Sequence, residues 1–191
     1  MTVGPAMRMF ILYLRKGRTD GNFKILRDGG RLDIFYQCTA GALFLSHAIR
    51  KDTVFKAILT GPPDPPKIIT VDGEKLYDIR MDESTWTPII KKVLKGGSHP
   101  GISVEKGSFQ YVIRNAGESG NVYVLEERGE DISQVQLGPD PVFVLGDQVG
   151  LPKKDEKYAL RYGTKISLGR TRYTAAGCIQ IINHWLDRSE I

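Results

Sequence analysis

The feature that most restricts the fold of this chain is a set of short apolar runs, of which residues 141–146, PVFVLG, are the clearest. A strand with one face in water alternates apolar and polar residues, whereas a run that is apolar throughout needs cover on both faces. Segments with the three- and four-residue spacing of a half-buried helix separate these runs. The alternation predicts an α/β layer fold, with helices covering a sheet.

Sequence signals place the individual elements. Strands are predicted at residues 8–14, 53–59, 67–71, 121–129, 141–146 and 165–169. A helix is predicted from Arg31 through the apolar stripe Phe35, Cys38, Ala42, Leu45 and Ile49. Further helices are predicted from Ser84, as a cap, to Gly96, over residues 153–162, and along Cys178, Ile181, Ile182, Trp185 and Leu186. Residues 16–29, 61–66 and 96–103 are predicted loops, and residues 71–76 a hairpin turn.

Composition is typical of one globular domain over residues 1–191, with 41% hydrophobic and 26% charged residues. The longest apolar runs are much shorter than the ~20 residues that cross a bilayer, so no membrane partner is expected. The chain has only two cysteines, Cys38 and Cys178, which argues against a disulfide framework and favours the cytoplasm. The three histidines, His47, His99 and His184, are far apart and lack partners at metal-ligand spacing, so no metal is expected.

The net charge of +5, with a pI near 9.2, leaves two interpretations open. A slight excess of lysine on a solvated surface explains it, and so does a polyanionic partner, because basic surfaces release counterions from phosphates. Local clusters favour the second interpretation. They are Arg15/Lys16/Arg18, Arg50/Lys51, Lys91/Lys92/Lys95, Lys153/Lys154 and Arg170/Arg172.

The sequence contains no P-loop, no G-x-G-x-x-G after a strand and no G-x-S-x-G elbow. It does contain apolar strands that end in glycine, at Gly146 and Gly169, and a third strand that ends similarly at Leu125. Any one of these glycines is explained by a tight turn. Ligands bind beyond the carboxyl ends of strands in an open parallel sheet, so the three ends together predict a cofactor site built from main-chain groups.

Three segments resemble the C-terminal half of the SPOUT methyltransferases: FVLGDQVGLPKKDE (143–156), ISLG (166–169) and CIQIINHWLDR (178–188). Within that superfamily the chain most resembles the archaeal tRNA pseudouridine N1-methyltransferases, which modify position 54 in the TΨC loop. MRMFILYL, GRLDIFYQC, FLSHAIRKDTVF and GPPDPP in the N-terminal half agree. The resemblance runs from Met7 to Arg188, and residues 1–6 precede the usual start.

The resemblance implies a mostly parallel sheet with a deep trefoil knot within about residues 121–191, a rare exception to the rule against knots. It also implies a homodimer packed through the knot helices and S-adenosyl-L-methionine bound by the knot loops. Transferred position by position, the implied cofactor contacts are Leu125, Gly146, Leu168, Gly169, Arg170, Thr171, Arg172, Tyr173 and Cys178.

Three positions depart from the pattern of many relatives. Arg170 stands where they carry Pro, and Gly177 and Gln148 stand where they carry His. These departures affect side-chain contacts to RNA near Arg170 and Arg172 more than main-chain contacts to the cofactor.

Methylation of pseudouridine requires that N1 lose its proton before or during attack, and the enzyme aligns the reactants and stabilises the developing charge. The catalytic candidates are the arginines Arg31, Arg8 and Arg50, which would stabilise the anionic ring, and Asp33, which would accept the proton or orient an arginine. A charged first helical turn is the alternative interpretation of residues 31–33. Arg31, Arg50 and Lys51 are expected to line a groove for tRNA phosphates, with Arg8 close to the target base.

Two other functions stay open. One is a related SPOUT enzyme that methylates pseudouridine N1 in small-subunit ribosomal RNA. The other is a non-catalytic RNA-binding or assembly protein that retains the knot. A small-molecule or protein methyltransferase fits the basic charge less well.

Overall fold

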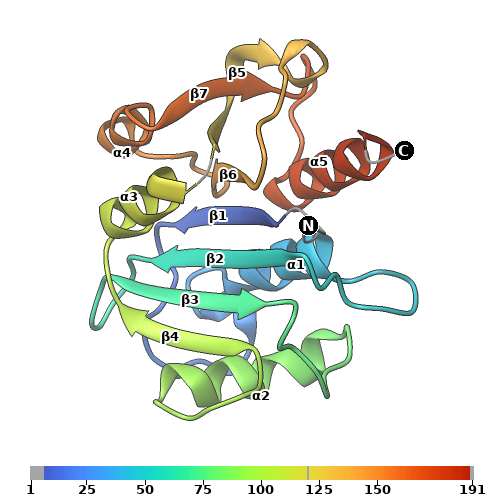
Figure 1. Ribbon diagram of the computed structural model, residues 1–191. Helices are drawn as coiled ribbons and strands as arrows, with labels where there is room; N and C mark the ends of the chain where they lie inside the picture. Colours follow the sequence, from blue (N-terminus) through green and yellow to red (C-terminus); the bar gives the residue numbers. More distant parts are fainter. Residues whose placement is uncertain (1–6, 120, 190–191) are drawn as a thin grey trace.

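The computed structural model describes residues 7–119 and 121–189, which form one seven-stranded sheet with helices on both faces (Figure 1). The strands are β1 (Arg8–Leu14), β2 (Thr53–Leu59), β3 (Lys67–Asp72), β4 (Ile102–Lys106), β5 (Asn121–Asp131), β6 (Pro141–Gly146) and β7 (Gly163–Ser167). They lie in the order β4-β3-β2-β1-β6-β5-β7. The two pairs that involve β3 are antiparallel and the other four are parallel, which confirms the mostly parallel α/β fold.

Five α-helices flank the sheet: α1 (Leu32–Leu43), α2 (Glu83–Leu94), α3 (Phe109–Ser119), α4 (Lys153–Ala159) and α5 (Ala175–Ser189). Two short 3₁₀ helices, η1 (Leu26–Asp28) and η2 (Ile132–Gln134), lie in the connections. Figure 1 shows α1 and α5 side by side at the start of β1, and α3 and α4 near the other end of that strand.

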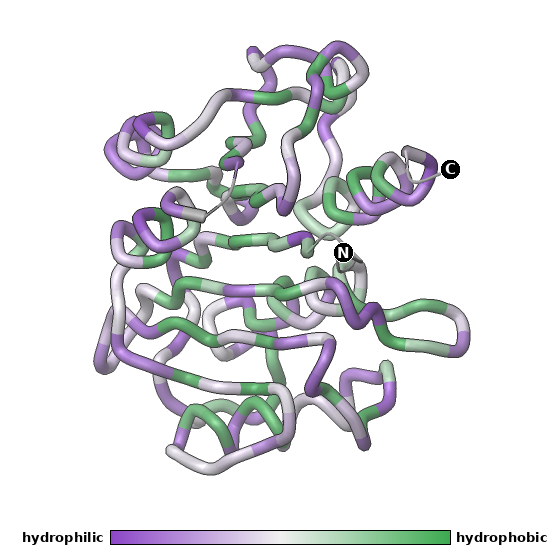
Figure 2. The backbone as a smooth tube through the Cα atoms, in the orientation of Figure 1, coloured by the Kyte–Doolittle hydropathy of each residue, from purple (hydrophilic) through white to green (hydrophobic). Residues whose placement is uncertain are grey.

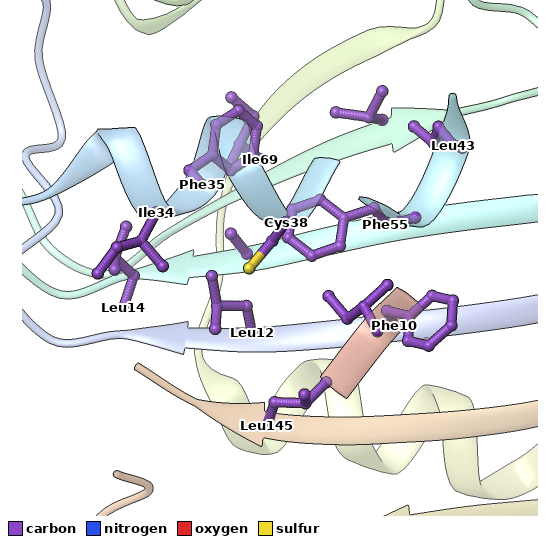
Figure 3. Packing of buried hydrophobic residues seen from close by; sticks show 14 of the residues in the cluster. Phe10, Leu12, Leu14, Ile34, Phe35, Cys38, Leu43, Phe55, Ile69 and Leu145 are labelled. Atoms are coloured by element: carbon purple, nitrogen blue, oxygen red, sulfur yellow. The ribbon is translucent and has the colours of Figure 1, made fainter. Parts of the chain in front are cut away.

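Alternating side chains of the central strands fill two hydrophobic cores. In β1, Phe10, Leu12 and Leu14 contribute to the core beneath α1, α2 and α5, whereas Ile11 packs in the core beneath α3 and α4. Figure 2 shows the hydrophobic residues gathered along these strands, with hydrophilic residues in many of the outer loops. Figure 3 shows Cys38 of α1 lying over β1 and β2, close to Leu12. Strands covered on both faces explain why the runs lack polar alternation.

The helix predicted from Arg31 is shorter than its apolar stripe suggested. α1 ends at Leu43, because Phe44 has an extended backbone and its segment folds back to pair with Ile49. Leu45 is therefore 46% exposed rather than buried on a helix. The apolar residues after Leu43 continue the helical spacing without continuing the helix.

Two other local predictions are corrected. The cap of α2 is Asp82 rather than Ser84, since an Asp82 carboxylate oxygen accepts a hydrogen bond of 2.8 Å from the Thr85 N–H. Such a cap stabilises a helix by about 1 kcal/mol. Residues 71–76 form a turn that leads toward α2, and the hairpin is instead formed by β2 and β3 around residues 61–66.

Candidate functional site: a cavity at the strand ends

A cavity of about 660 Å³ opens beyond the carboxyl ends of β5, β6 and β7. Its volume lies in the range of small-molecule sites. Its walls come from the strand ends, from the loops at residues 146–151 and 168–174, and from single faces of α1, α4 and α5. Leu125, Leu145, Ile166 and Leu168 give it an apolar floor, which suits a flat aromatic group.

The loop that follows β6 forms one wall, and Gly146 permits its tight path. A Cβ at Gly146 would overlap the backbone of Gly150 and Leu151. The close approach of the chain to itself therefore requires glycine here, rather than the direct approach of a ligand. Glycine shapes the cavity by folding this loop back over the end of the strand.

Arg15 and Asp147 hold this loop in place from the neighbouring strand end. The buried Asp147 carboxylate accepts hydrogen bonds of 2.9 Å from the N–H groups of Arg15 and Val149. The Arg15 guanidinium donates two bonds, of 3.1 and 2.9 Å, to the Gly150 carbonyl. The loop is therefore fixed by buried and charge-assisted hydrogen bonds before a ligand binds.

The loop after β7 forms the opposite wall. Gly169 has a φ of +100°, a conformation that favours glycine, and no heavy atom lies within 4 Å of the position that its Cβ would take. The Ser167 hydroxyl accepts a hydrogen bond of 3.1 Å from the Gly169 N–H and donates one of 3.2 Å to its carbonyl. Gly169 therefore lines the cavity with open space beside its Cα, while its N–H and carbonyl are both bonded to Ser167.

Carboxylates on the cavity wall favour a ligand with a cationic part. Glu126, Glu127, Asp147 and Glu156 line it. Glu156 pairs with Lys165 at 2.8 Å and Glu127 pairs with Arg172 at 2.7 Å. Within the described part of the chain no ion pair forms at Glu126 or Asp147, and both carboxylates accept hydrogen bonds from main-chain N–H groups.

Cys178 contributes a half-buried thiol to the wall. Burial raises the pKa of this thiol above its ordinary value, so it stays protonated at neutral pH. Cys38 is buried in the core, and burial raises its pKa as well. A neutral thiol is a poor nucleophile, so Cys178 serves the cavity as an apolar surface.

Arg31 enters the cavity from the start of α1 in an unusual backbone conformation. Its φ is +69°, in the left-handed region that residues other than glycine seldom adopt. Its guanidinium binds Asp33 through two hydrogen bonds, from Nε to Oδ1 at 3.0 Å and from Nη2 to Oδ2 at 3.1 Å. These bonds raise the pKa of Arg31 above its ordinary value and fix the guanidinium. Strained backbone of this kind occurs often at functional sites.

The structure brings most of the predicted cofactor residues together. Leu125, Gly146, Leu168, Gly169, Thr171, Arg172, Tyr173 and Cys178 all line the cavity. Arg170 lies between two lining residues but is exposed outside it. Of the catalytic candidates, Arg31 lines the cavity. Asp33 does not line it but forms an ion pair with Arg31.

Arg8 lies at the opposite end of the sheet. It begins β1, whereas the cavity lies beyond the other end of the parallel strand β6, about 20 Å away along seven residues. Arg8 is 3% exposed and donates hydrogen bonds of 3.0 Å to Asn183 and Asp187 of α5. Arg8 therefore lies far from the cavity of its own chain, and its expected position beside the target base stays a prediction.

Arg50 and Lys51 precede β2 and lie at that same amino end of the parallel strands. Arg50 donates two hydrogen bonds to Asp187, of 2.8 and 2.7 Å, and these lower the pKa of Asp187. Lys51 donates to the Leu76 carbonyl at 3.5 Å. Of the three residues expected to line a groove for tRNA, only Arg31 lines the cavity, and the role of Arg50 and Lys51 in RNA binding stays a prediction.

Sequence reasoning did not identify Arg15, Asp147, Glu126 or Glu156 as site residues, although all four build the cavity wall or its support. Asp147 carried a signal, since it directly follows the glycine that ends β6. None of the helices in the described chain combines the length and apolar composition that crossing a bilayer requires. Residues 7–119 and 121–189 also hold no cluster of three His, Cys, Asp or Glu side chains suited to a metal ion.

Comparisons with known proteins agree with this geometry. Residues 7–191 match the model of a family described as "Putative SAM-dependent RNA methyltransferase". A tRNA (pseudouridine(54)-N(1))-methyltransferase of Thermococcus kodakarensis is 36% identical over 197 residues, covering 95% of this chain and 99% of that protein. The protein of the same name from Methanocaldococcus jannaschii is 37% identical over 203 residues, covering 97% and 98%.

A solved structure shares the fold at lower identity. Archaeoglobus fulgidus Nep1 bound to S-adenosylhomocysteine superposes with a TM-score of 0.64 at 15% identity, over 96% of this chain and 98% of that one.

Proposed function

Because this chain belongs to the family of S-adenosylmethionine-dependent RNA methyltransferases, we propose that it methylates N1 of pseudouridine at position 54 of tRNA. The cavity at the strand ends carries the proposal, since it contains eight of the nine residues expected to contact the cofactor. The relatives that bear this activity in their names match over nearly the full length of both chains. The substrate is inferred from those names and the cofactor from the family.

The residues of the cavity fit S-adenosylmethionine. The apolar floor suits the adenine ring, and the absence of a side chain at Gly169 leaves room for the ligand beside this loop. Glu126 and Asp147 suit the positive charges of the amino acid part and the sulfonium. When bound, the cofactor supplies an electrophilic methyl group. The chain supplies the shape and the negative potential that orient it.

Arg31 is the residue we assign to the RNA side of the reaction. Its guanidinium stays charged and is fixed by Asp33, so it offers a pre-oriented donor to a uracil-like carbonyl oxygen. Charge grows on that oxygen as N1 loses its proton, and fixed donors stabilise such charge strongly. The paired geometry favours Asp33 as the positioning residue for Arg31, rather than as the proton acceptor.

The knot and the homodimer belong to the same proposal. Residues of α5 and of the connection between β5 and β6, including Ile132, Val135 and Leu137, pack in the same core, as expected where the last segment passes that connection. On α5, Ile179 and Ile182 are buried, whereas Ile181 and Trp185 remain partly exposed on a neighbouring strip. A two-fold contact along that strip would cover them. A tRNA substrate and two free cysteines favour the cytoplasm.

Nucleoside analysis by mass spectrometry tests the function. The protein is incubated with cofactor and either a tRNA transcript pseudouridylated at position 54 or the same transcript with uridine there. One methyl group should appear on pseudouridine and none on uridine. A second reaction uses a ribosomal RNA fragment that contains pseudouridine, which tests the alternative that the substrate is ribosomal RNA. Methylation of that fragment as fast as, or faster than, the tRNA transcript would reassign the substrate.

A further inference from the structure

A second hollow, of about 520 Å³, lies between the long loop after β1 and the end of α2. Lys24, Lys91 and Lys95 line it, and Asp28 is its one carboxylate. Asn22 and Phe23 complete the surface from the loop side. Three cations against one anion make the hollow electropositive.

The loop after β1 packs closely against α2 at the hollow. Gly21 lies so close to α2 that a Cβ there would come within 2.8 Å of the Lys91 carbonyl and of the Lys95 Cε atom. The Lys91 ammonium lies 5.7 Å from the centre of the Phe23 ring, a cation–π contact. These contacts fix the loop against α2 and restrict the Lys91 side chain, whereas Lys24 and Lys95 are exposed.

These lysines form no ion pair, unlike many other cations on the described surface. Arg18 is paired with Asp20 at 2.8 Å and Lys106 with Asp64 at 2.7 Å. In residues 7–119 and 121–189, by contrast, no side-chain hydrogen bond or ion pair engages Lys24, Lys91 or Lys95. Lysines near a helix C-terminus also complement the helix dipole, which accounts for Lys91 and Lys95 at the end of α2. That effect does not explain why Lys24, from another element, faces the same hollow.

The hollow adjoins the cofactor cavity through one short segment. Asp28 lines the hollow and Arg31, three residues later, lines the cavity. The Arg31 N–H donates to the Arg27 carbonyl at 3.0 Å, so this turn is compact. Arg27 is exposed between the two sites. An anionic strand whose target base lies beside Arg31 therefore meets Arg27 and then the hollow.

We propose that this basic hollow binds the phosphate backbone of the RNA substrate beside the modified base. The inference rests on the proposed function, because it assigns the surface that positions the tRNA arm. Phosphate contacts fix the register of an RNA without reading its sequence.

The test compares two variants of the full-length protein that lose the same charge. Lys91→Gln/Lys95→Gln removes two cations from the hollow, and Lys75→Gln/Arg80→Gln removes two from side chains that are 74% and 88% exposed elsewhere. Affinity for pseudouridylated tRNA transcript is measured across salt concentrations, alongside methyl transfer and cofactor affinity. The hollow variant should bind tRNA about 10- to 50-fold more weakly, with a salt slope lower by about 1.4 to 1.8, and keep its cofactor affinity.

Each outcome decides one proposal. If the parent methylates tRNA and the two variants bind it alike, the hollow does not bind RNA, and the proposed function stands. If the parent transfers no methyl group but the hollow variant alone loses tRNA binding, the hollow stands and the proposed function falls. A loss of cofactor affinity in the hollow variant would also overturn the assignment, because the lysines would then act through the cavity.

Discussion

Arginines occupy both ends of the parallel strands, and the two ends use them differently. At the amino end, Arg8 and Arg50 converge on Asp187 of α5 and tie the last helix to the sheet. At the carboxyl end, Arg15 binds a main-chain carbonyl of the cavity loop, and Arg31 is held by a carboxylate only two residues away. One end is committed to the fold, whereas the other presents loops and charges to a ligand.

The difference shows that the role of an arginine depends on its partner. Asp187 lies 137 residues from Arg50 in the sequence, so only the folded chain reveals their pairing. Asp33 lies only two residues from Arg31, and its hydrogen bonds fix the Arg31 guanidinium while Arg31 still lines the cavity. Substitutions at the carboxyl end of the strands should therefore change ligand binding and the chemical step. Substitutions at the amino end should change the stability of the fold.

The largest effect is expected at Gly146. Gly146→Val should weaken S-adenosylmethionine binding by about 100-fold or more, because its side chain displaces residues 150–151 from the cavity wall. The displacement should also lower the free energy of unfolding by about 1–3 kcal/mol. Calorimetric titration gives the affinity, and a thermal melt without cofactor shows that the variant is folded. A folded variant with parental affinity would remove this loop from the site.

Arg31 should affect the chemical step. Arg31→Gln is expected to lower kcat by about 100-fold at saturating tRNA, while cofactor affinity stays within about threefold of the parent. Arg31→Lys should recover only part of the rate, since an ammonium cannot reproduce the fork to Asp33. Single-turnover kinetics separate the chemical step from binding. An unchanged kcat with a raised KM would make Arg31 a binding residue.

Arg50 tests whether the amino end of the strands contributes to stability alone or also to RNA binding. Arg50→Ala should lower the free energy of unfolding by about 1–2 kcal/mol, because it removes two hydrogen bonds to a partly exposed carboxylate. Affinity for tRNA should stay at the parental value at a temperature where both proteins are folded. Unchanged stability with tenfold weaker tRNA binding would show that the amino end faces RNA after all.

The amino-end cluster should also respond to pH in one direction. Hydrogen bonds from Arg50, and then from Arg8, hold the pKa of Asp187 below its ordinary value of 3.8. A lowered pKa contributes stability above the ordinary value, and the contribution is lost as the pH falls through the folded-state pKa. Asp187→Asn should therefore be less stable than the parent by about 1 kcal/mol at pH 7. That gap should close in acid, and a gap that widens there would contradict the assignment.

The smallest effect is expected for the exposed pair between Arg172 and Glu127, whose side chains are 81% and 60% exposed. Arg172→Ala should change the free energy of unfolding by less than about 0.5 kcal/mol. Cofactor affinity should stay within about threefold, because the backbone of this loop rather than its side chains is expected to contact the ligand. A tenfold loss would assign the guanidinium itself to the cofactor.

Much of the fold could be predicted because the apolar runs are short and regular. β1, β2 and β6 have the predicted bounds. β4 was missed because an edge strand with exposed Ser103 and Glu105 lacks an apolar run. The helix predicted from Arg31 was too long because the apolar residues after Leu43 keep helical spacing although the backbone leaves the helix at Phe44. The spacing of apolar residues does not reveal such a change of backbone direction.

The cofactor wall was predictable for a related reason. Strand ends and glycines are visible in a sequence, and parallel strands bring their carboxyl ends together. The RNA-facing side was not predictable, because Arg8, Arg31 and Arg50 look alike until their partners are known. Lys24 and Lys91 lie on segments far apart in the sequence, so their shared hollow appears only in the folded chain.

The most direct test of the account is methyl transfer by the parent protein and by Arg31→Gln and Arg50→Ala on the same pseudouridylated tRNA. Labelled S-adenosylmethionine reports the rate, and nucleoside mass spectrometry locates the product. The account predicts N1-methylpseudouridine at position 54, formed at the parental rate by Arg50→Ala and about 100-fold more slowly by Arg31→Gln. Absence of that nucleoside with the parent protein, or the reverse order of the two variants, would contradict it.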